Sequence, residues 1–162
     1  MDDDPSPAGA RRDAALDVRV SSLVGRLPLS RVRVAAIAGQ VLRGERCRAA
    51  ILTVTFVGNR EIARLHRTHL RQDGPTDIIT FQHASPGRGA PLVGDVYIAP
   101  AVARGHARDA GCSWREELAR LTIHGVLHAL GWEHPDGAGR TRSAMWRRQE
   151  RWLGRLHQDG AW

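Results

Sequence analysis

The sequence has little of what several common classes of protein need. Only two of its 162 residues are cysteines, Cys47 and Cys112, and they stand far apart in no Cys-x-x-Cys arrangement. A disulfide framework and a cysteine-based zinc site are therefore not expected, and the two thiols are predicted to be reduced and buried. No apolar run approaches the roughly 20 residues of a membrane-spanning helix, so no membrane partner is expected.

The first residues also lack the composition of a secretory signal. Residues 1–13 are acidic and rich in proline where such a signal would begin basic and continue apolar. They have too few apolar side chains to offset the entropy of ordering, so a disordered tail is predicted there. The length of the remainder fits a single domain, residues 14–158, and the protein is expected to be cytoplasmic.

Lysine is missing altogether, so all 24 residues counted as lysine or arginine are arginines, and the formal net charge is +7. A positive chain favours a polyanionic partner, because each neutralised phosphate releases condensed counterions. Genomic base composition is a second explanation for the exclusive use of arginine. Charge alone therefore leaves a nucleic-acid partner open.

Apolar periodicity divides the rest of the chain into strands and helices. The predicted strands alternate apolar and polar side chains or are rich in β-branched residues: Asp17–Ser22, Ile51–Val57, Thr76–Phe81 and Asp95–Ile98. The predicted helices have capping or stop residues at their ends: from Ser30 to Gly44, from Asn59 through His69, from Pro100 to Asp109, from Ser113 to about Leu130, and from Thr141 to Leu156. This order predicts an α+β domain with a small mixed β-sheet covered by helices.

The segment from His124 to His134 carries the clearest chemistry. His124 and His128 stand four residues apart, so a helix turns both imidazoles toward a single ion. Gly131 can adopt the left-handed conformation that ends a helix, and the chain can then turn back to bring His134 to the same ion. Three neutral imidazoles leave a fourth tetrahedral position for water, which is typical of a catalytic zinc site. One Zn²⁺ per chain is therefore predicted, on a helix of the C-terminal half and the following loop.

The same spacing, His-x-x-x-His-x-x-Gly-x-x-His, is that of the metzincin zinc proteases, with one difference. Metzincins place a glutamate directly after the first histidine, where it acts as the general base, and this chain has Gly125 there. A protease mechanism has thus lost its base in the usual place, although a degenerate metzincin-like protease stays an alternative. We interpret Gly125 as permitting a close approach of the backbone to substrate or metal.

The chain resembles the YbeY endoribonucleases, bacterial enzymes of ribosomal RNA maturation and ribosome quality control. Their motif is His-Gly-x-Leu-His-x-x-Gly-x-Asp-His, and residues 124–134 differ from it only by Glu133 in place of aspartate. Residues 73–81, Asp-Gly-Pro-Thr-Asp-Ile-Ile-Thr-Phe, resemble the family's Asp-Lys-Pro-Thr-Asp-Val-Leu-Ser-Phe segment. Residues 94–98 resemble its Gly-Asp-Ile strand. The three matches follow one another in the family's order.

The resemblance implies a zinc-dependent endoribonuclease of α+β fold that cleaves single-stranded RNA. It implies that His124, His128 and His134 hold the metal. It also implies that the substrate is ribosomal RNA on the small subunit, processed at the 16S 3′ end, and it points to ribosome-associated protein partners.

One departure from the family pattern concerns the residue that meets the substrate phosphate. The family usually has Tyr-Arg-Gly just before Asp-Lys-Pro-Thr, and alignment on Asp73 puts its arginine at Leu70 of this chain. Arg67 or Arg71 is expected to supply that charge from a neighbouring position, unless this chain holds the phosphate in another way.

Three carboxylates near these motifs have two interpretations each. If the resemblance holds, Asp77 and Asp95 lie on strands near the site; otherwise Asp77 forms turn hydrogen bonds and Asp95 caps the start of a strand. Glu133, beside the third histidine, either orients an imidazole or faces solvent.

The sequence identifies no general base, and it does not decide whether water or the ribose 2′-hydroxyl attacks the phosphorus. A non-catalytic, zinc-containing RNA-binding factor of ribosome assembly is an alternative from another class of protein. A structural zinc site normally has a fourth protein ligand, so the coordination shell distinguishes the two.

Overall fold

The structure is a computed structural model that describes residues 15–84 and 87–162. Its elements are β1 (Leu16–Ser22), α1 (Arg31–Gly44), β2 (Ala50–Phe56), α2 (Asn59–Leu70), β3 (Ile78–His83), β4 (Leu92–Ile98), α3 (Pro100–Ala110), α4 (Trp114–Ala129), the 3-10 helix η1 (Gly137–Arg142) and α5 (Ala144–Gln158). The predicted disordered tail, residues 1–13, lies outside the described residues, as do residues 85–86 of the loop after β3.

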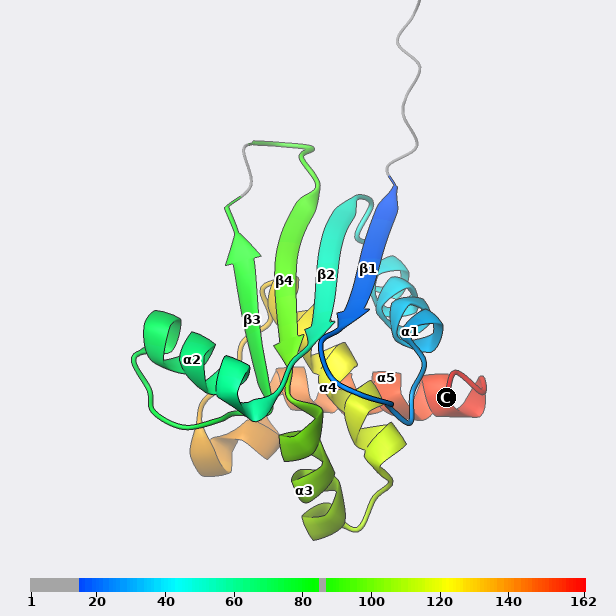
Figure 1. Ribbon diagram of the computed structural model, residues 1–162. Coiled ribbons are helices and arrows are strands. Elements are labelled where there is room, and N and C mark those ends of the chain that lie inside the picture. Colours follow the sequence, from blue (N-terminus) through cyan, green and yellow to red (C-terminus); the bar gives the residue numbers. More distant parts are fainter. Residues whose placement is uncertain (1–14, 85–86) are drawn as a thin grey trace, which may run out of the picture.

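The strands form one mixed sheet in the order β1-β2-β4-β3 (Figure 1). β1 runs parallel to β2 and β2 runs parallel to β4, whereas β3 and β4 form an antiparallel pair at one edge. Parallel neighbours need long crossover connections, and α1 provides the one between β1 and β2. The predicted α+β class with a small mixed sheet is confirmed.

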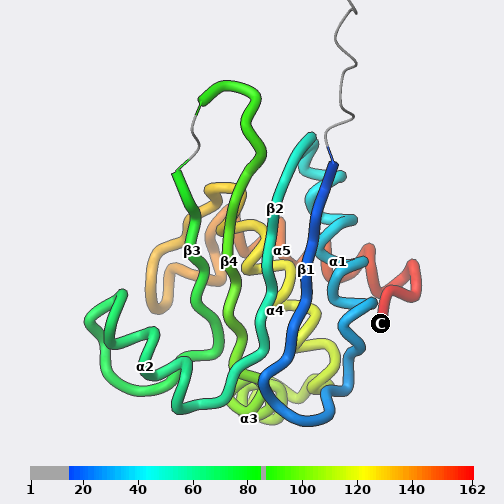
Figure 2. The backbone as a smooth tube through the Cα atoms, turned by 45° about the horizontal axis from the view of Figure 1, so that its top comes forward, coloured from blue at the N-terminus to red at the C-terminus, as the bar shows by residue number. Residues whose placement is uncertain are grey.

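One face of the sheet carries the main hydrophobic core. In β2 the alternate side chains Leu52, Val54 and Phe56 are completely buried, because the period of two turns them to the same face. Helices α1 and α4 cover this face, and α5 packs against α4 (Figure 2). Helix α2 lies by the β3 edge, where Ile62 and Ile79 belong to a smaller core.

Helix α4 is buried on nearly every side because it packs against α1, α3, α5, β3 and β4. Ser113 caps it by accepting a hydrogen bond from the Glu116 amide at 3.0 Å, as the Ser-x-x-Glu pattern predicts. Three of its polar side chains are buried: Glu117, Thr122 and His124. Thr122 donates to the Leu118 carbonyl oxygen at 2.8 Å within the helix, whereas the ring of His124 needs a partner from another element.

The last helix begins later than predicted. Ser143 caps α5 by accepting from the Trp146 amide at 3.0 Å, so the helix starts at Ala144 and not at Thr141. The preceding residues, Gly137–Arg142, form η1 instead. The last two residues of the chain also pack against the main core, beyond the predicted end of the domain at 158.

Helix α2 differs from its prediction in two ways. Its N-cap is Gly58, and Asn59 is already inside the helix. His69, predicted to share a face with Ile62 and Leu65, is exposed whereas those two are buried, because α2 lies at the sheet edge and reaches little of the core. The His69 ring instead packs edge-on against Phe81, with the ring centroids 4.9 Å apart.

The structure also tests two expectations from the sequence, one about the cysteines and one about membrane-spanning helices. Cys47 and Cys112 are unpaired, as expected, but half-buried instead of buried, because each follows the end of a helix at the margin of the core. No helix among the described residues combines the length and the hydropathy that a membrane span requires.

Candidate metal centre

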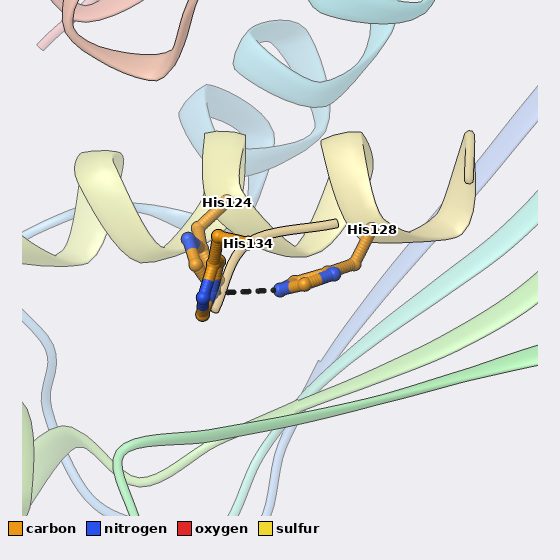
Figure 3. A group of neighbouring side chains, drawn as sticks. All are labelled: His124, His128 and His134. Atoms are coloured by element: carbon orange, nitrogen blue, oxygen red, sulfur yellow. Dashed lines mark hydrogen bonds between the residues drawn. The ribbon is translucent and has the colours of Figure 1, made fainter. Parts of the chain in front are cut away.

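Three histidine side chains converge at the C-terminal end of α4. His124 and His128 leave one face of the helix a turn apart, and their ring centroids lie 4.5 Å from each other. His134 meets them from the following loop, with its centroid 5.1 Å from that of His124 and 5.0 Å from that of His128 (Figure 3). The structure thus brings together the three residues predicted as metal ligands.

Gly131 makes this return of the chain possible. Its φ of 91° lies in the left-handed region, which glycine adopts without a Cβ penalty. Its amide donates to the His128 carbonyl oxygen at 2.9 Å, and the Trp132 amide donates to the Leu127 carbonyl oxygen at 3.0 Å. These two bonds form a Schellman motif, which satisfies the last carbonyls of the helix. The predicted role of Gly131 is confirmed.

The distances between imidazole nitrogens fit a tetrahedral metal ion. His134 Nε2 lies 3.2 Å from His128 Nε2 and 3.4 Å from His124 Nε2. Nitrogens bound to one tetrahedral zinc at about 2.0–2.1 Å lie roughly 3.3–3.4 Å apart, along an edge of the tetrahedron. The side chains therefore already have the spacing of a ligand set.

The hydrogen bonds of the Nδ1 atoms show that the Nε2 atoms of His124 and His134 are free to bind a metal ion. His124 Nδ1 lies 2.7 Å from Gln149 Oε1, and His134 Nδ1 lies 3.1 Å from the Pro135 carbonyl oxygen. The Gln149 amide is oriented by Glu150, which accepts from Gln149 Nε2 at 2.9 Å. Since both oxygens only accept, both Nδ1 atoms donate, and in the neutral rings both Nε2 atoms carry lone pairs. Two lone pairs this close repel each other unless a cation lies between them.

Burial keeps the rings of His124 and His128 neutral. Only 4% of His124 is exposed, and burial, assisted by the nearby His128, lowers the pKa of His124 to about 3. Burial also lowers the pKa of His128, with His134 as the second cause. Neutral imidazole is the form that binds metal, so at neutral pH these two rings need to release no proton.

A chain of hydrogen bonds, buried at His124 and half-buried farther along, holds the His124 ring in place. Gln149, on α5, is 1% exposed and accepts from His124 Nδ1. Its amide donates to Glu150, which also accepts from Arg120 Nε at 3.0 Å. Arg120 pairs in turn with Glu117 at 2.5 Å. The ring is therefore fixed by both α4 and α5.

Gln149→Met is expected to weaken zinc binding by about 10- to 100-fold, because it nearly preserves the side-chain volume but removes the acceptor that fixes the His124 tautomer. The matched control is Gln158→Met at the exposed C-terminal end of the same helix, which should bind like the wild type. Competition with a chromophoric chelator measures the affinities. Equal zinc affinity in Gln149→Met and the wild type would show that this hydrogen bond does not position the ligand.

The three histidines line a cavity of about 590 Å³, and β3 supplies part of the opposite wall. Among the described residues, two buried side-chain polar atoms have no hydrogen-bond partner, Thr80 Oγ1 and Arg140 Nε. Both residues line this cavity. Because unpaired buried polar atoms are costly, their concentration in one cavity is typical of a site that binds a polar ligand.

His66 lines the same cavity although no sequence motif includes it. Its Nδ1 lies 2.9 Å from the Gly74 carbonyl oxygen and therefore donates to it. In the neutral ring Nε2 then carries the lone pair. His66 is thus one of the cavity residues that can accept a proton.

The three carboxylates of the sequence motifs lie in different surroundings. Asp77 lines the cavity, with its side chain 13% exposed and Oδ2 lying 3.4 Å from His106 Nδ1. Asp95 does not line it: this residue sits within β4, not at its start, and binds His83 Nε2 at 2.6 Å. Glu133 also lines the cavity, at its open side: its side chain is 82% exposed and lies 3.9 Å from His128 Nδ1.

The arginines expected to meet the phosphate lie beside the cavity and not in its wall. Arg67 is exposed and pairs with Asp73 at 2.9 Å. Arg71, in the left-handed conformation, ends α2. Among the described residues, neither of them lines the cavity, whereas Leu70 does.

Gly125 faces the sheet and not the metal centre. A Cβ at this position would lie 2.5 Å from Val96 Cγ1 and 3.2 Å from Ile78 Cδ1. The glycine therefore permits a close approach of α4 to β3 and β4, and the expected approach to substrate or metal was wrong. A glutamate here would enter the core, so the position supplies no general base.

Comparison with known proteins agrees with the resemblance seen in the motifs. Residues 29–157 match the family model described as Endoribonuclease YbeY. The chain belongs to the YbeY endoribonuclease family. The family match spans the three histidines, β3 and η1, and so includes the whole wall of the cavity.

YbeY relatives from several bacteria support the assignment. Endoribonuclease YbeY of Chloroherpeton thalassium is 36% identical over 120 residues, or 74% of this chain and 82% of the relative. That of Syntrophotalea carbinolica is 32% identical over 126 residues, or 76% and 84%. That of Bifidobacterium animalis subsp. lactis is 46% identical over 89 residues, or 51% of this chain and 49% of the relative.

A solved structure shares the fold. The solution structure of TM1509 from Thermotoga maritima superposes with a TM-score of 0.58 over 89% of this chain and 94% of that protein. The sequence identity is 22%, so the likeness concerns the fold alone. This chain therefore combines YbeY sequence motifs with an architecture that is found in another solved protein.

Proposed function

We propose that this YbeY-family chain is a zinc-dependent endoribonuclease that cleaves single-stranded RNA. The observation that carries the proposal is the convergence of the His124, His128 and His134 nitrogens at tetrahedral spacing in a cavity. Three imidazoles suit zinc, which prefers nitrogen and sulfur ligands in tetrahedral sites. One Zn²⁺ per chain is proposed, bound by a single domain, residues 14–158.

When bound, zinc would supply the Lewis acid that polarises a phosphoryl oxygen or lowers the pKa of a coordinated water. The protein's own groups complete the site. Gln149 holds the His124 ring, and Thr80 offers a hydroxyl in the cavity wall. His66 and Asp77, in the same wall, are among the groups able to accept a proton from the nucleophile. The nucleophile is either water or the ribose 2′-hydroxyl.

The proposed substrate is ribosomal RNA of the small subunit, with roles in 16S 3′-end maturation and ribosome quality control in the cytoplasm. The net charge of +7 supports a polyanionic substrate. Arg67 and Arg71, beside the cavity, are proposed to contact phosphates that flank the cleaved bond. Ribosome-associated proteins are the proposed protein partners.

The two alternative functions, a non-catalytic assembly factor and a metzincin-like protease, fit the geometry of the site less well. A structural zinc in a non-catalytic assembly factor would have a closed ligand shell. Among the described residues, no fourth His, Cys, Asp or Glu joins the group, which leaves a coordination position for water. A metzincin-like protease needs a base next to His124, and Gly125 packs against the sheet there.

The decisive experiment measures metal content and cleavage of one RNA in single-stranded and duplex form by the purified protein. The single strand should be cut and the duplex should resist. Chelation should abolish cleavage and zinc should restore it. A 2′,3′-cyclic phosphate at the product end would identify the 2′-hydroxyl as the nucleophile. Zinc-loaded protein that cuts neither free RNA nor precursor RNA in small ribosomal subunits would favour the assembly factor.

A further inference from the structure

Arg140 stands at the junction of two cavities. It belongs to η1, and it is the only arginine among the described residues that line the 590 Å³ cavity of the metal centre. It also lines a second cavity of about 480 Å³. The two cavities share Asp77, His124 and Arg140. A polymeric ligand that occupies both cavities would therefore run past Arg140, beside the buried His124.

Among the residues that the structure describes, none provides a counterion for the charge of Arg140. Its Nε is buried without a partner, and its side chain makes no hydrogen bond or ion pair with any other residue that the structure describes. Arg120, in the second cavity, is the opposite case, since it pairs with Glu117 and Glu150. A shielded cation without an anion is costly, so the position of Arg140 indicates that a ligand supplies the negative charge.

Phosphate is the anion that suits this side chain. Guanidinium forms paired, charge-assisted hydrogen bonds with phosphate oxygens, with a geometry that lysine lacks. The Trp146 ring supports the group, with its centroid 5.9 Å from Arg140 Cζ. We propose that Arg140 binds the RNA phosphodiester beside the metal centre, with the flanking nucleotides in the two cavities. The proposal rests on the proposed function, because it takes the ligand to be RNA.

This assignment accounts for the departure from the family pattern at position 70. Leu70 lines the metal-centre cavity but carries no charge, and Arg67 is paired with Asp73 outside the wall. Arg140 brings a guanidinium to the same cavity from η1, a segment distant in sequence. The phosphate contact is thus supplied from another part of the chain.

The test is the binding of a 2′-O-methyl oligoribonucleotide, followed by fluorescence anisotropy. Arg140→Gln should weaken binding by about tenfold or more, the expected loss of a charged hydrogen-bond pair. Arg140→Lys should weaken binding less than Arg140→Gln does, because the positive charge stays. It should still weaken binding, because lysine cannot form the paired hydrogen bonds of the guanidinium. Arg142→Gln is the matched control, since it removes the same charge from η1 at a residue that lines neither cavity, and it should bind like the wild type.

Inorganic phosphate provides a second readout, because it should compete with the oligonucleotide in the wild type and much less in Arg140→Gln. Equal losses in Arg140→Gln and Arg142→Gln, unchanged binding in Arg140→Gln, or a wild type that does not bind the oligonucleotide would overturn the proposal. If Arg140→Gln does not fold, Arg140→Lys decides: weaker binding supports the proposal and unchanged binding overturns it. Binding that depends on Arg140, without any RNA cleavage, would contradict the proposed activity but still support the proposed phosphate contact of Arg140.

Discussion

His134→Ala is expected to remove the metal, and RNA cleavage with it, while the fold stays in place. His134 is half-buried in the loop after α4. Among the described residues outside the cluster, its ring bonds only to the adjacent Pro135 carbonyl oxygen. Two remaining imidazoles do not close a stable zinc site. Cleavage should therefore fall by more than about a hundredfold, beyond the loss typical of a residue that only supports a ligand. Metal content after dialysis, cleavage rate and thermal unfolding measure the three effects.

His124→Ala should lose the metal to the same extent as His134→Ala, and the protein should also become less stable. The substitution empties a buried site and leaves Gln149 Oε1 without its donor, which costs about 1–3 kcal/mol. The control is His157→Ala on α5. This histidine is not part of the cluster, and its ring contacts Trp162 near the end of the chain. It should keep both metal and activity. Stoichiometric zinc in His124→Ala, His128→Ala and His134→Ala alike would refute the metal centre.

The convergence of the three histidines was predictable from sequence because every signal behind it is local. The helical period aligns His124 with His128, and the left-handed preference of glycine at Gly131 turns the chain back to His134. The α+β class followed in the same way from periodicity within single strands and helices. These inferences needed no knowledge of which elements pack together.

The rest of the site depends on contacts between distant segments. Gln149 reaches His124 only because α5 packs against α4, and nothing about a glutamine in an amphipathic helix marks it as a partner of a ligand. Arg140 and Thr80 come together only in the folded cavity. The sequence instead directed attention to Arg67, a neighbour of Leu70 along the chain, which in the structure pairs with an exposed aspartate.

Gly125 shows how an analogy with another family's motif can misplace a side chain. The motif position is the same as that of the metzincin base, but the direction of the side chain depends on what α4 packs against. Here Val96 and Ile78 fill that direction. Gly125→Glu would therefore force a charge into the core, and its effect on RNA or peptide cleavage would report misfolding and not mechanism.

Gly125→Ala is the informative variant, and it is expected to destabilise the protein by about 1–3 kcal/mol through overpacking. Replacing glycine by alanine within an exposed helix normally stabilises by up to about 1 kcal/mol. Here the new methyl group would lie 2.5 Å from Val96 Cγ1 and 3.1 Å from Val96 Cγ2, both in the core. Helix α4 must then move away from β4, and it carries His124 and His128 with it. Displacements near 1 Å can cost about a hundredfold in rate, so a steep loss of RNA cleavage is expected even where zinc is retained.

A double-mutant cycle separates this clash from a general effect of alanine. Val96→Ala removes the two closest of the three methyl groups that the new Cβ would meet and leaves Ile78 Cδ1 at 3.2 Å. Gly125→Ala should therefore cost less in the Val96→Ala background, with a coupling of about 1 kcal/mol or more. Gly154→Ala, in α5 with open space where a Cβ would lie, is the control and should leave the protein as stable or slightly more stable. Urea unfolding of the variants gives the free energies, and RNA cleavage is measured on the same preparations. Additive effects of Gly125→Ala and Val96→Ala would mean that the helix does not depend on glycine to approach the sheet. The loss of cleavage would then need another cause.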